Sequence, residues 1–81
     1  MKKILTEEDN QFLDTVSANV TKIRKEKGYS QLDLATEIGY ANAAYYGKIE
    51  IRKDGHHFHI VQLAKIAKVL DADICDFFKT K

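Results

Sequence analysis

The segment from Tyr29 to Glu50 most strongly limits how this chain can fold, because it has the pattern of two short helices that meet at a glycine. Ser30 is a good N-cap for the first of them, and Asp33, three residues later, completes a capping box with a short side chain. Gly39 supplies the positive φ with which a helix commonly ends. The pattern therefore predicts a helix-turn-helix arrangement, in which the second helix is held away from the body of the domain.

Apolar side chains at three- and four-residue steps predict further helices on both sides of this pair. The first helix is expected from about Glu7 to Lys27, with an acidic start and a basic end that suit the helix dipole. The glycine-linked helices are expected at about Gln31–Ile38 and Asn42–Glu50, and a fourth helix from about Phe58 to Leu70. A last short helix, capped by Asp73, is predicted to bury three apolar side chains, Ile74, Phe77 and Phe78.

The same periodicity predicts which side chains form the core. Tyr45 and Tyr46 are adjacent and therefore point about 100° apart on a helix, so we expect Tyr46 to lie inside and Tyr45 outside. The apolar face of the fourth helix is expected to be wide. The other predicted core residues are Phe12, Leu13, Val16, Val20, Ile23, Leu34, Ala35, Ile38, Ile49, Ile60, Leu63, Ala64, Ile66, Ala67 and Leu70.

The 81-residue length and the absence of proline predict one compact all-α domain spanning residues 1–81, with its core at about 12–78. The single cysteine, Cys75, excludes an internal disulfide, so a reduced intracellular setting is expected. The start of the chain turns acidic before any long apolar run, and no stretch approaches the roughly 20 apolar residues of a membrane span. We therefore expect a cytoplasmic protein without a signal peptide or a membrane segment.

The overall charge is close to neutral. Thirteen basic and twelve acidic residues leave a net charge of +1 and a pI near 7.8. Domains that bind nucleic acids strongly often have a pI above about 9. The basic residues gather in two places, at the end of the first helix and after the helix pair, and they are Lys22, Arg24, Lys25, Lys27, Lys48, Arg52 and Lys53. A basic face is therefore compatible with the sequence, although the total charge does not indicate one.

Residues that could carry catalysis or bind a metal do not form a known pattern. The sequence has no glycine-rich phosphate loop, no histidine beside a serine or cysteine nucleophile and no paired carboxylates in an apolar surround, so neither an enzyme nor a cofactor is predicted. His56, His57 and His59 raise the alternative of a metal site, but only Asp54 is nearby to complete a tetrahedral set. We expect instead a polar loop that caps the fourth helix. Cys75 is interpreted as a buried or interfacial small hydrophobe rather than a redox switch.

Several stretches of the chain together resemble a known family. Residues 23–31 read Ile-Arg-Lys-Glu-Lys-Gly-Tyr-Ser-Gln, then follow Leu34-Ala35, Gly39 and Ile49-Glu50, and residues 63–70 read Leu-Ala-Lys-Ile-Ala-Lys-Val-Leu. Over about Val16 to Phe78, this pattern resembles the phage-repressor/Cro-type helix-turn-helix domain, also called the xenobiotic-response-element-like regulators. The resemblance implies a compact five-helix, lambda-repressor-like fold that binds double-stranded DNA.

The resemblance also implies roles for particular residues. Gln31 matches a glutamine that contacts the phosphate backbone, where a side-chain amide beside free helix amides forms a small anion clamp. Arg24 and Glu50 match positions that pair and tie the first helix to the end of the third. Arg52 and Lys53 match the loop after the third helix, where contacts with the DNA backbone are common. The positions that face bases or nearby phosphates correspond to Asn42, Ala43, Ala44, Tyr45 and Lys48.

Two features set this chain apart from the common family pattern. Gly39 and Glu50 are eleven residues apart, one more than is usual, which predicts a longer turn or a later start of the third helix. Asn42 has a second interpretation, as the N-cap of that helix. The third helix also offers few of the side chains that read bases directly, so we expect a modest direct readout and a larger share from phosphate contacts and DNA shape.

These expectations define a small transcriptional regulator that reads the major groove with its third helix, as a homodimer on a palindromic site. The dimer surface is expected in the C-terminal region, where Ile74, Phe77 and Phe78 offer more apolar area than a short helix needs. The alternative is a protein-interaction module on the same fold, such as an antitoxin or an antirepressor-like adaptor, which the near-neutral charge favours. Within the regulator interpretation, a phage-type repressor and a restriction-modification controller both stay open.

Overall fold

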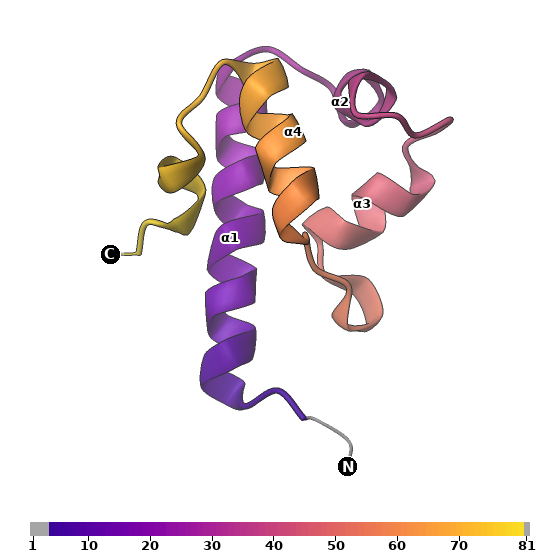
Figure 1. Ribbon diagram of the computed structural model, residues 1–81. Helices are drawn as coiled ribbons and strands as arrows, with labels where there is room; N and C mark the ends of the chain where they lie inside the picture. Colours follow the sequence, from indigo (N-terminus) through magenta and orange to yellow (C-terminus); the bar gives the residue numbers. More distant parts are fainter. Residues whose placement is uncertain (1–3, 81) are drawn as a thin grey trace.

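The computed structural model describes residues 4–80, and all the regular structure in this range is helical (Figure 1). The all-α prediction is confirmed. The prediction that the chain has no signal peptide concerns its N-terminal segment, and the first three residues of that segment lie outside the described range. Within that range no helix is long and apolar enough to cross a membrane. The elements are α1 (Glu7–Glu26), α2 (Gln31–Glu37), α3 (Ala44–Glu50), η1 (Lys53–Gly55), α4 (Ile60–Leu70) and η2 (Ile74–Phe78), where η denotes a 3₁₀ helix.

Capping boxes begin three of the four α-helices. At α2, Ser30 Oγ accepts from the amide of Asp33 at 2.9 Å and the Asp33 carboxylate accepts from the amide of Ser30 at 3.3 Å, as the sequence predicts. Thr6 and Asp9 form an equivalent box at α1. At α4 the box consists of His59 and Gln62, and it confirms the prediction that the histidine loop caps this helix.

The third helix starts later than Asn42, in agreement with the later start that the spacing of Gly39 and Glu50 predicts. Gly39, which follows the end of α2, has the positive φ that commonly ends a helix, here 105°. The amide of Tyr40 donates to the carbonyl of Ala35 at 2.9 Å. The third helix then begins at Ala44 and not at Asn42. Asn42 Oδ1 accepts from the amide of Ala44 at 2.9 Å, so the side chain closes a local turn that competes with helical backbone bonding.

Helix α1 is the longest helix of the described chain; η2 and α3 pack against it, and α4 contacts η2 and α2 (Figure 1). Tyr46 has no exposed surface whereas Tyr45 is 44% exposed, which confirms the predicted orientation of the pair. The buried apolar residues are Val16, Val20, Leu34, Ala35, Ile38, Tyr46, Ile49, Phe58, Leu63, Ile66, Ala67, Leu70 and Phe77.

The predicted inward side of α4 is confirmed at Leu63, Ile66, Ala67 and Leu70, but its apolar face is narrower than predicted. Ile60 is 64% exposed and Ala64 is also exposed, so neither belongs to the core. Gln62 is buried instead, because its side chain donates to the Tyr40 hydroxyl at 2.5 Å and accepts from the amide of His59 at 2.8 Å. A polar residue whose hydrogen bonds are satisfied can therefore occupy the inward position.

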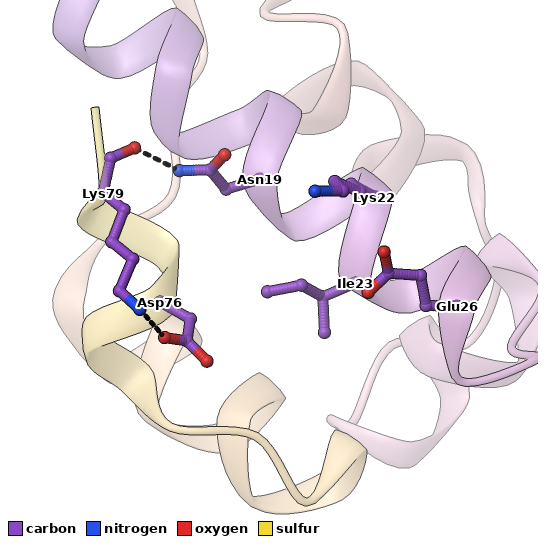
Figure 2. Close-up of a pocket in the computed structure, with 6 residues that line it drawn as sticks. All are labelled: Asn19, Lys22, Ile23, Glu26, Asp76 and Lys79. Carbon is purple, nitrogen blue, oxygen red and sulfur yellow. Dashed lines mark hydrogen bonds and ion pairs between the residues drawn. The ribbon is translucent and has the colours of Figure 1, made fainter. Parts of the chain in front are cut away.

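The C-terminal helix η2 packs against α1 around a hollow of about 280 Å³ (Figure 2). Asn19 Nδ2 donates to the carbonyls of Phe77, at 3.0 Å, and Lys79, at 2.9 Å, while Lys79 Nζ pairs with Asp76 at 2.8 Å. Asp73 Oδ1 accepts from the amide of Cys75, which confirms the predicted cap, although the helix is 3₁₀ and not α.

This arrangement limits how much of the predicted dimer surface is exposed. Phe77 is fully buried in the core, and Ile74 and Phe78 are half-buried against it. The ring of Phe78 also stacks on that of Phe12, with centroids 6.4 Å apart. The apolar side chains of η2 therefore help to close this fold, because a thin core needs them, and Ile74 and Phe78 keep only part of their surface exposed.

Candidate nucleic-acid interface

The carboxylate of Glu50 joins the three elements that would build the interface. Arg24 of α1 contacts it through Nε, 2.7 Å from Oε2, and through Nη2, 3.2 Å from Oε1. The ion pair implied by the family resemblance is thus present. Gln31 Nε2 at the start of α2 donates to Oε1 at 2.9 Å, and the Tyr46 hydroxyl donates to Oε2 at 2.5 Å. Three of these hydrogen bonds, two from Arg24 and one from Gln31, therefore fix α3 relative to α1 and α2, and the bond from Tyr46 lies within α3.

The contacts within this buried cluster favour the charged forms of Arg24 and Glu50. Burial by itself would raise the pKa of Glu50, but the hydrogen bonds from Arg24, Tyr46 and Gln31 outweigh it, so the pKa of Glu50 is lowered and the carboxylate stays ionised. Burial lowers the pKa of Arg24 less than Glu50 raises it, so the guanidinium stays charged. Burial and the bond to Glu50 raise the pKa of Tyr46, which keeps its hydroxyl a donor. No buried side-chain nitrogen or oxygen among the described residues lacks a hydrogen bond.

The lowered pKa of Glu50 predicts a loss of stability in acid. Between the folded pKa and the ordinary value of 4.5, the unfolded chain binds more protons than the folded one, so stability increases with pH there. We expect the contribution of Glu50 to be complete above pH 4.5 and to disappear as the pH falls through the folded pKa. Urea unfolding at a series of pH values measures it. The Glu50→Gln variant should have a shallower acid slope, and equal slopes in the two proteins would contradict the prediction.

The outer side of α3 is exposed. Ala44, Tyr45 and Lys48 all lie on the surface, while Tyr46, Ile49 and Glu50 face inward. The carbonyl of Ile49 accepts from buried Ser17 Oγ at 3.2 Å, which adds a second link to α1. One helical face thus anchors α3, and the opposite face is exposed to solvent at Ala44, Tyr45 and Lys48.

Tyr45 is held between two other rings. Its centroid lies 5.4 Å from that of Tyr40 and 5.7 Å from that of His56, with the rings close to perpendicular in both pairs. His56 is fixed in turn, because its Nδ1 donates to the carbonyl of Lys53 at 2.6 Å. Edge-to-face contacts of this kind favour one ring orientation. The Tyr45 side chain is therefore positioned beside Lys48 on the outer side of α3.

Gln31 lies at the predicted position but its amide is engaged inside the protein. The side chain is half-buried, and Nε2 donates to Glu50. A Cβ at Gly47 would lie 3.3 Å from Gln31 Oε1, so α2 and α3 approach each other closely here. The structure therefore gives Gln31 a positioning role in the free protein, and the implied phosphate contact stays a prediction.

Arg52 has a structural role, and the predicted phosphate contact is corrected. Its side chain is only 9% exposed. Nη1 lies 3.1 Å from Asn10 Oδ1 and 3.2 Å from Asp14 Oδ1, Nε donates to the carbonyl of His56 at 3.0 Å, and Nη2 donates to that of Gly55 at 3.1 Å. Arg52 also has a left-handed φ of 55°. The guanidinium therefore fastens the η1 loop to α1.

The remaining predicted contact residues differ in how accessible they are. Lys53 is exposed in η1 and Ala43 is half-buried before α3. Asn42 is exposed and its Oδ1 accepts from the amide of Ala44, but the N-cap of α3 is Ala43, so the interpretation of Asn42 as the N-cap is wrong. Of the two cations predicted after α3, only Lys53 is exposed.

This region also contains three residues that the sequence did not indicate, Tyr40, Gly47 and Gln62. Gly47 could have been found, because an isolated glycine within a helical pattern commonly marks a close approach. Tyr40 and Gln62 could not, since they meet across 22 residues. The rings of Tyr40 and His56 around Tyr45 likewise depend on the tertiary fold.

Among residues 4–80, no group of three or more His, Cys, Asp and Glu side chains could hold a metal ion. The histidines instead contact backbone carbonyls or cap α4. Cys75 is exposed, so the buried one of its two predicted placements is wrong, and the interfacial one stays a prediction. Its pKa is raised, chiefly by the negative charge of Asp73 and the hydrogen bond to it, which is the opposite of an activated thiolate.

Comparison with known proteins adds no functional assignment. No protein-family model, curated protein or solved structure matches this chain. The region itself combines a short exposed helix face, a tyrosine held by neighbouring rings and two exposed lysines, Lys48 and Lys53. These groups suit binding to an anionic polymer better than a covalent reaction.

Proposed function

We propose that this chain is a DNA-binding transcriptional regulator of the phage-repressor/Cro type, in which α2 and α3 act as a helix-turn-helix. The observation that carries the proposal is the division of α3 into two sides. Its inner side is fixed by Glu50, and its outer side presents Ala44, Tyr45 and Lys48 to solvent. A recognition helix needs such an arrangement, because contacts with bases require rigid positioning.

The dimensions and chemistry of α3 support this role. A helix with its side chains is about 10–12 Å across, which fits a major groove about 12 Å wide, and the seven residues of α3 supply about two turns. The Lys48 ammonium can contact phosphate or guanine, the Ala44 methyl can contact the methyl of thymine, and the Tyr45 hydroxyl can bond to phosphate or a base edge. Lys53 is placed for a flanking phosphate. This set favours modest direct readout with a larger share from the backbone and DNA shape.

A dimer on a palindrome belongs to the proposal. One domain of this kind buries roughly 600–1,000 Å² on DNA, which supplies few contacts. Two copies related by a two-fold axis would read half-sites about one helical turn apart. The stoichiometry on DNA, measured by sedimentation, tests this part: a single copy bound to a palindromic duplex at saturation would refute it.

A protein-interaction module is the second candidate, and one observation favours it. Gln31 and Arg52, two of the implied phosphate-binding residues, are engaged by internal hydrogen bonds. This leaves the outer surface poor in free cations. Selection of binding sites from random duplexes separates the candidates. Enrichment of a palindromic sequence supports the regulator, and no salt-sensitive binding at low ionic strength favours the module.

Replacing Lys48 with alanine is expected to weaken DNA binding without changing stability. The lysine is exposed on the outer side of α3, so its loss should cost about 1 kcal/mol of binding free energy and reduce the slope of log K against log salt by about 1. Fluorescence anisotropy on the selected duplex, at several salt concentrations, measures both values. Lys22→Ala is the matched control, since Lys22 borders the hollow between α1 and η2. Equal losses in the two variants would remove α3 from the interface.

A further inference from the structure

The first turns of α1 reach beyond the other helices and carry apolar side chains that the core does not use (Figure 1). Leu5 is 39% exposed and Phe12 is 44% exposed. They border an open hollow of about 420 Å³. The residues that line it are Leu5, Glu8, Asp9, Phe12, Leu13 and His57, and we call it the α1 hollow.

The ring of Phe12 forms a ridge at the edge of the α1 hollow. It stacks on Phe78 at 6.4 Å, with an angle of 8° between the rings, and it also borders a second hollow of about 310 Å³. Leu13, beside it in sequence, is half-buried. A volume of about 420 Å³ falls within the roughly 300–1,000 Å³ of pockets that take up an apolar group. The hollow is thus large enough for an apolar side chain of a partner.

Charge indicates the chemistry of that partner. Residues 4–21 contain four carboxylates, Glu7, Glu8, Asp9 and Asp14, and no lysine or arginine. Arg52 pairs with Asp14, and His57 lies at the rim of the hollow. A second copy placed on the same surface would bring like charges together, which opposes association. A segment with lysine or arginine beside its apolar residue complements the surface.

We propose that the α1 hollow is a docking site for a basic amphipathic helix of a partner protein. One apolar side chain of that helix enters between Leu5 and Phe12, and its flanking lysine or arginine side chains face Glu8 and the neighbouring carboxylates. Recognition of an apolar helix face by a groove is a common mode of peptide binding. The site lies at the start of α1, whereas Ala44, Tyr45 and Lys48 belong to α3, so the proposal does not depend on DNA binding.

A synthetic helical peptide with leucines at positions i, i+3, i+4 and i+7 and lysines elsewhere tests the site on the full chain. Amide chemical shifts of ¹⁵N-labelled protein should change over residues 5–13 during the titration. The same peptide with glutamate in place of lysine should cause no change. Changes spread over all acidic surfaces, or no change with the lysine peptide, would overturn the proposal. Shifts over residues 5–13 that depend on protein concentration without peptide would assign the hollow to a second copy.

Two variants with matched controls localise the effect. Phe12→Ala should weaken the peptide about tenfold, because it removes the apolar wall of the hollow. Glu8→Lys should also weaken it, and it keeps the test decisive if Phe12→Ala lowers stability. Leu32→Ala and Glu37→Lys change an exposed leucine and an exposed glutamate on α2 and should bind as the unmodified chain does. Equal loss in Glu8→Lys and Glu37→Lys would show only general charge attraction and would refute the site.

Discussion

Replacing Glu50 with alanine is expected to lower the free energy of unfolding by about 3–5 kcal/mol. The carboxylate accepts four hydrogen bonds, two from Arg24 and one each from Gln31 and Tyr46. Without it, the Arg24 guanidinium, whose side chain is 7% exposed, is left as a buried charge without its counter-ion. The buried Tyr46 hydroxyl also loses its acceptor, which adds to the cost.

Urea unfolding at pH 7, followed by circular dichroism, measures this loss. For a domain of this size, about 3–5 kcal/mol corresponds to a fall in Tm on the order of 12–40 °C. Glu37→Ala is the matched control, because Glu37 is an exposed glutamate of α2, and its effect should stay within about 0.5 kcal/mol. A loss below about 1 kcal/mol in Glu50→Ala would show that the cluster does not hold α3 in place.

The double variant distinguishes an unpaired charge from a general packing defect. Arg24→Met in the Glu50→Ala background removes the guanidinium that Glu50→Ala leaves buried without its counter-ion. We expect the double variant to be more stable than Glu50→Ala alone, because a hydrophobic replacement for a buried pair is often tolerated. Additive losses in the double-mutant cycle would indicate that the two side chains do not interact energetically.

The parts of the fold that sequence predicted well depend on neighbours close along the chain. Ser30 and Asp33 form their capping box within one turn, and Gly39 adopts the predicted positive φ. The inward orientation of Tyr46 follows from helical periodicity alone. The ion pair of Arg24 and Glu50 spans 26 residues, and only the resemblance to a family made it predictable.

The errors come from side chains whose partners lie far away or compete locally. Asn42 delays the start of α3 by bonding to the amide of Ala44, a choice that periodicity does not contain. Arg52 is drawn inward by Asn10 and Asp14, 42 and 38 residues earlier, so its charge does not reach the surface. Gln62 becomes a core residue because it meets Tyr40. In each case the side chain forms a hydrogen bond within the chain, and this bond explains why the structure differs from the prediction.

For the candidate interface, the sequence predicted the positions of the residues better than their hydrogen-bond partners. Ala44, Tyr45 and Lys48 are exposed on the outer side of α3, where the pattern placed them. Gln31 and Arg52 occupy the expected positions along the chain, but internal acceptors engage them. A motif therefore predicts where a residue lies more securely than which partner it selects, since the partner depends on the whole fold.

Replacing Phe77 with alanine is expected to cost about 3–5 kcal/mol of folding free energy, because it removes a fully buried aromatic side chain and leaves a cavity. Phe77 holds η2 against α1, where its carbonyl accepts from Asn19 at 3.0 Å. The predicted loss follows from its place in the core. A residue that anchored a dimer would behave differently, since its removal would separate two folded copies and leave each fold intact.

Urea unfolding and sedimentation of the same variant separate these outcomes. Phe78→Ala is the matched control, because the neighbouring ring is half-buried and stacked on Phe12, and its loss should cost clearly less. We expect Phe77→Ala to show a low unfolding midpoint at every protein concentration, as loss of core packing requires. If the variant instead kept the stability of the unmodified chain and changed only its sedimentation coefficient, Phe77 would belong to an interface between copies. The position of η2 against α1 would then have to be revised.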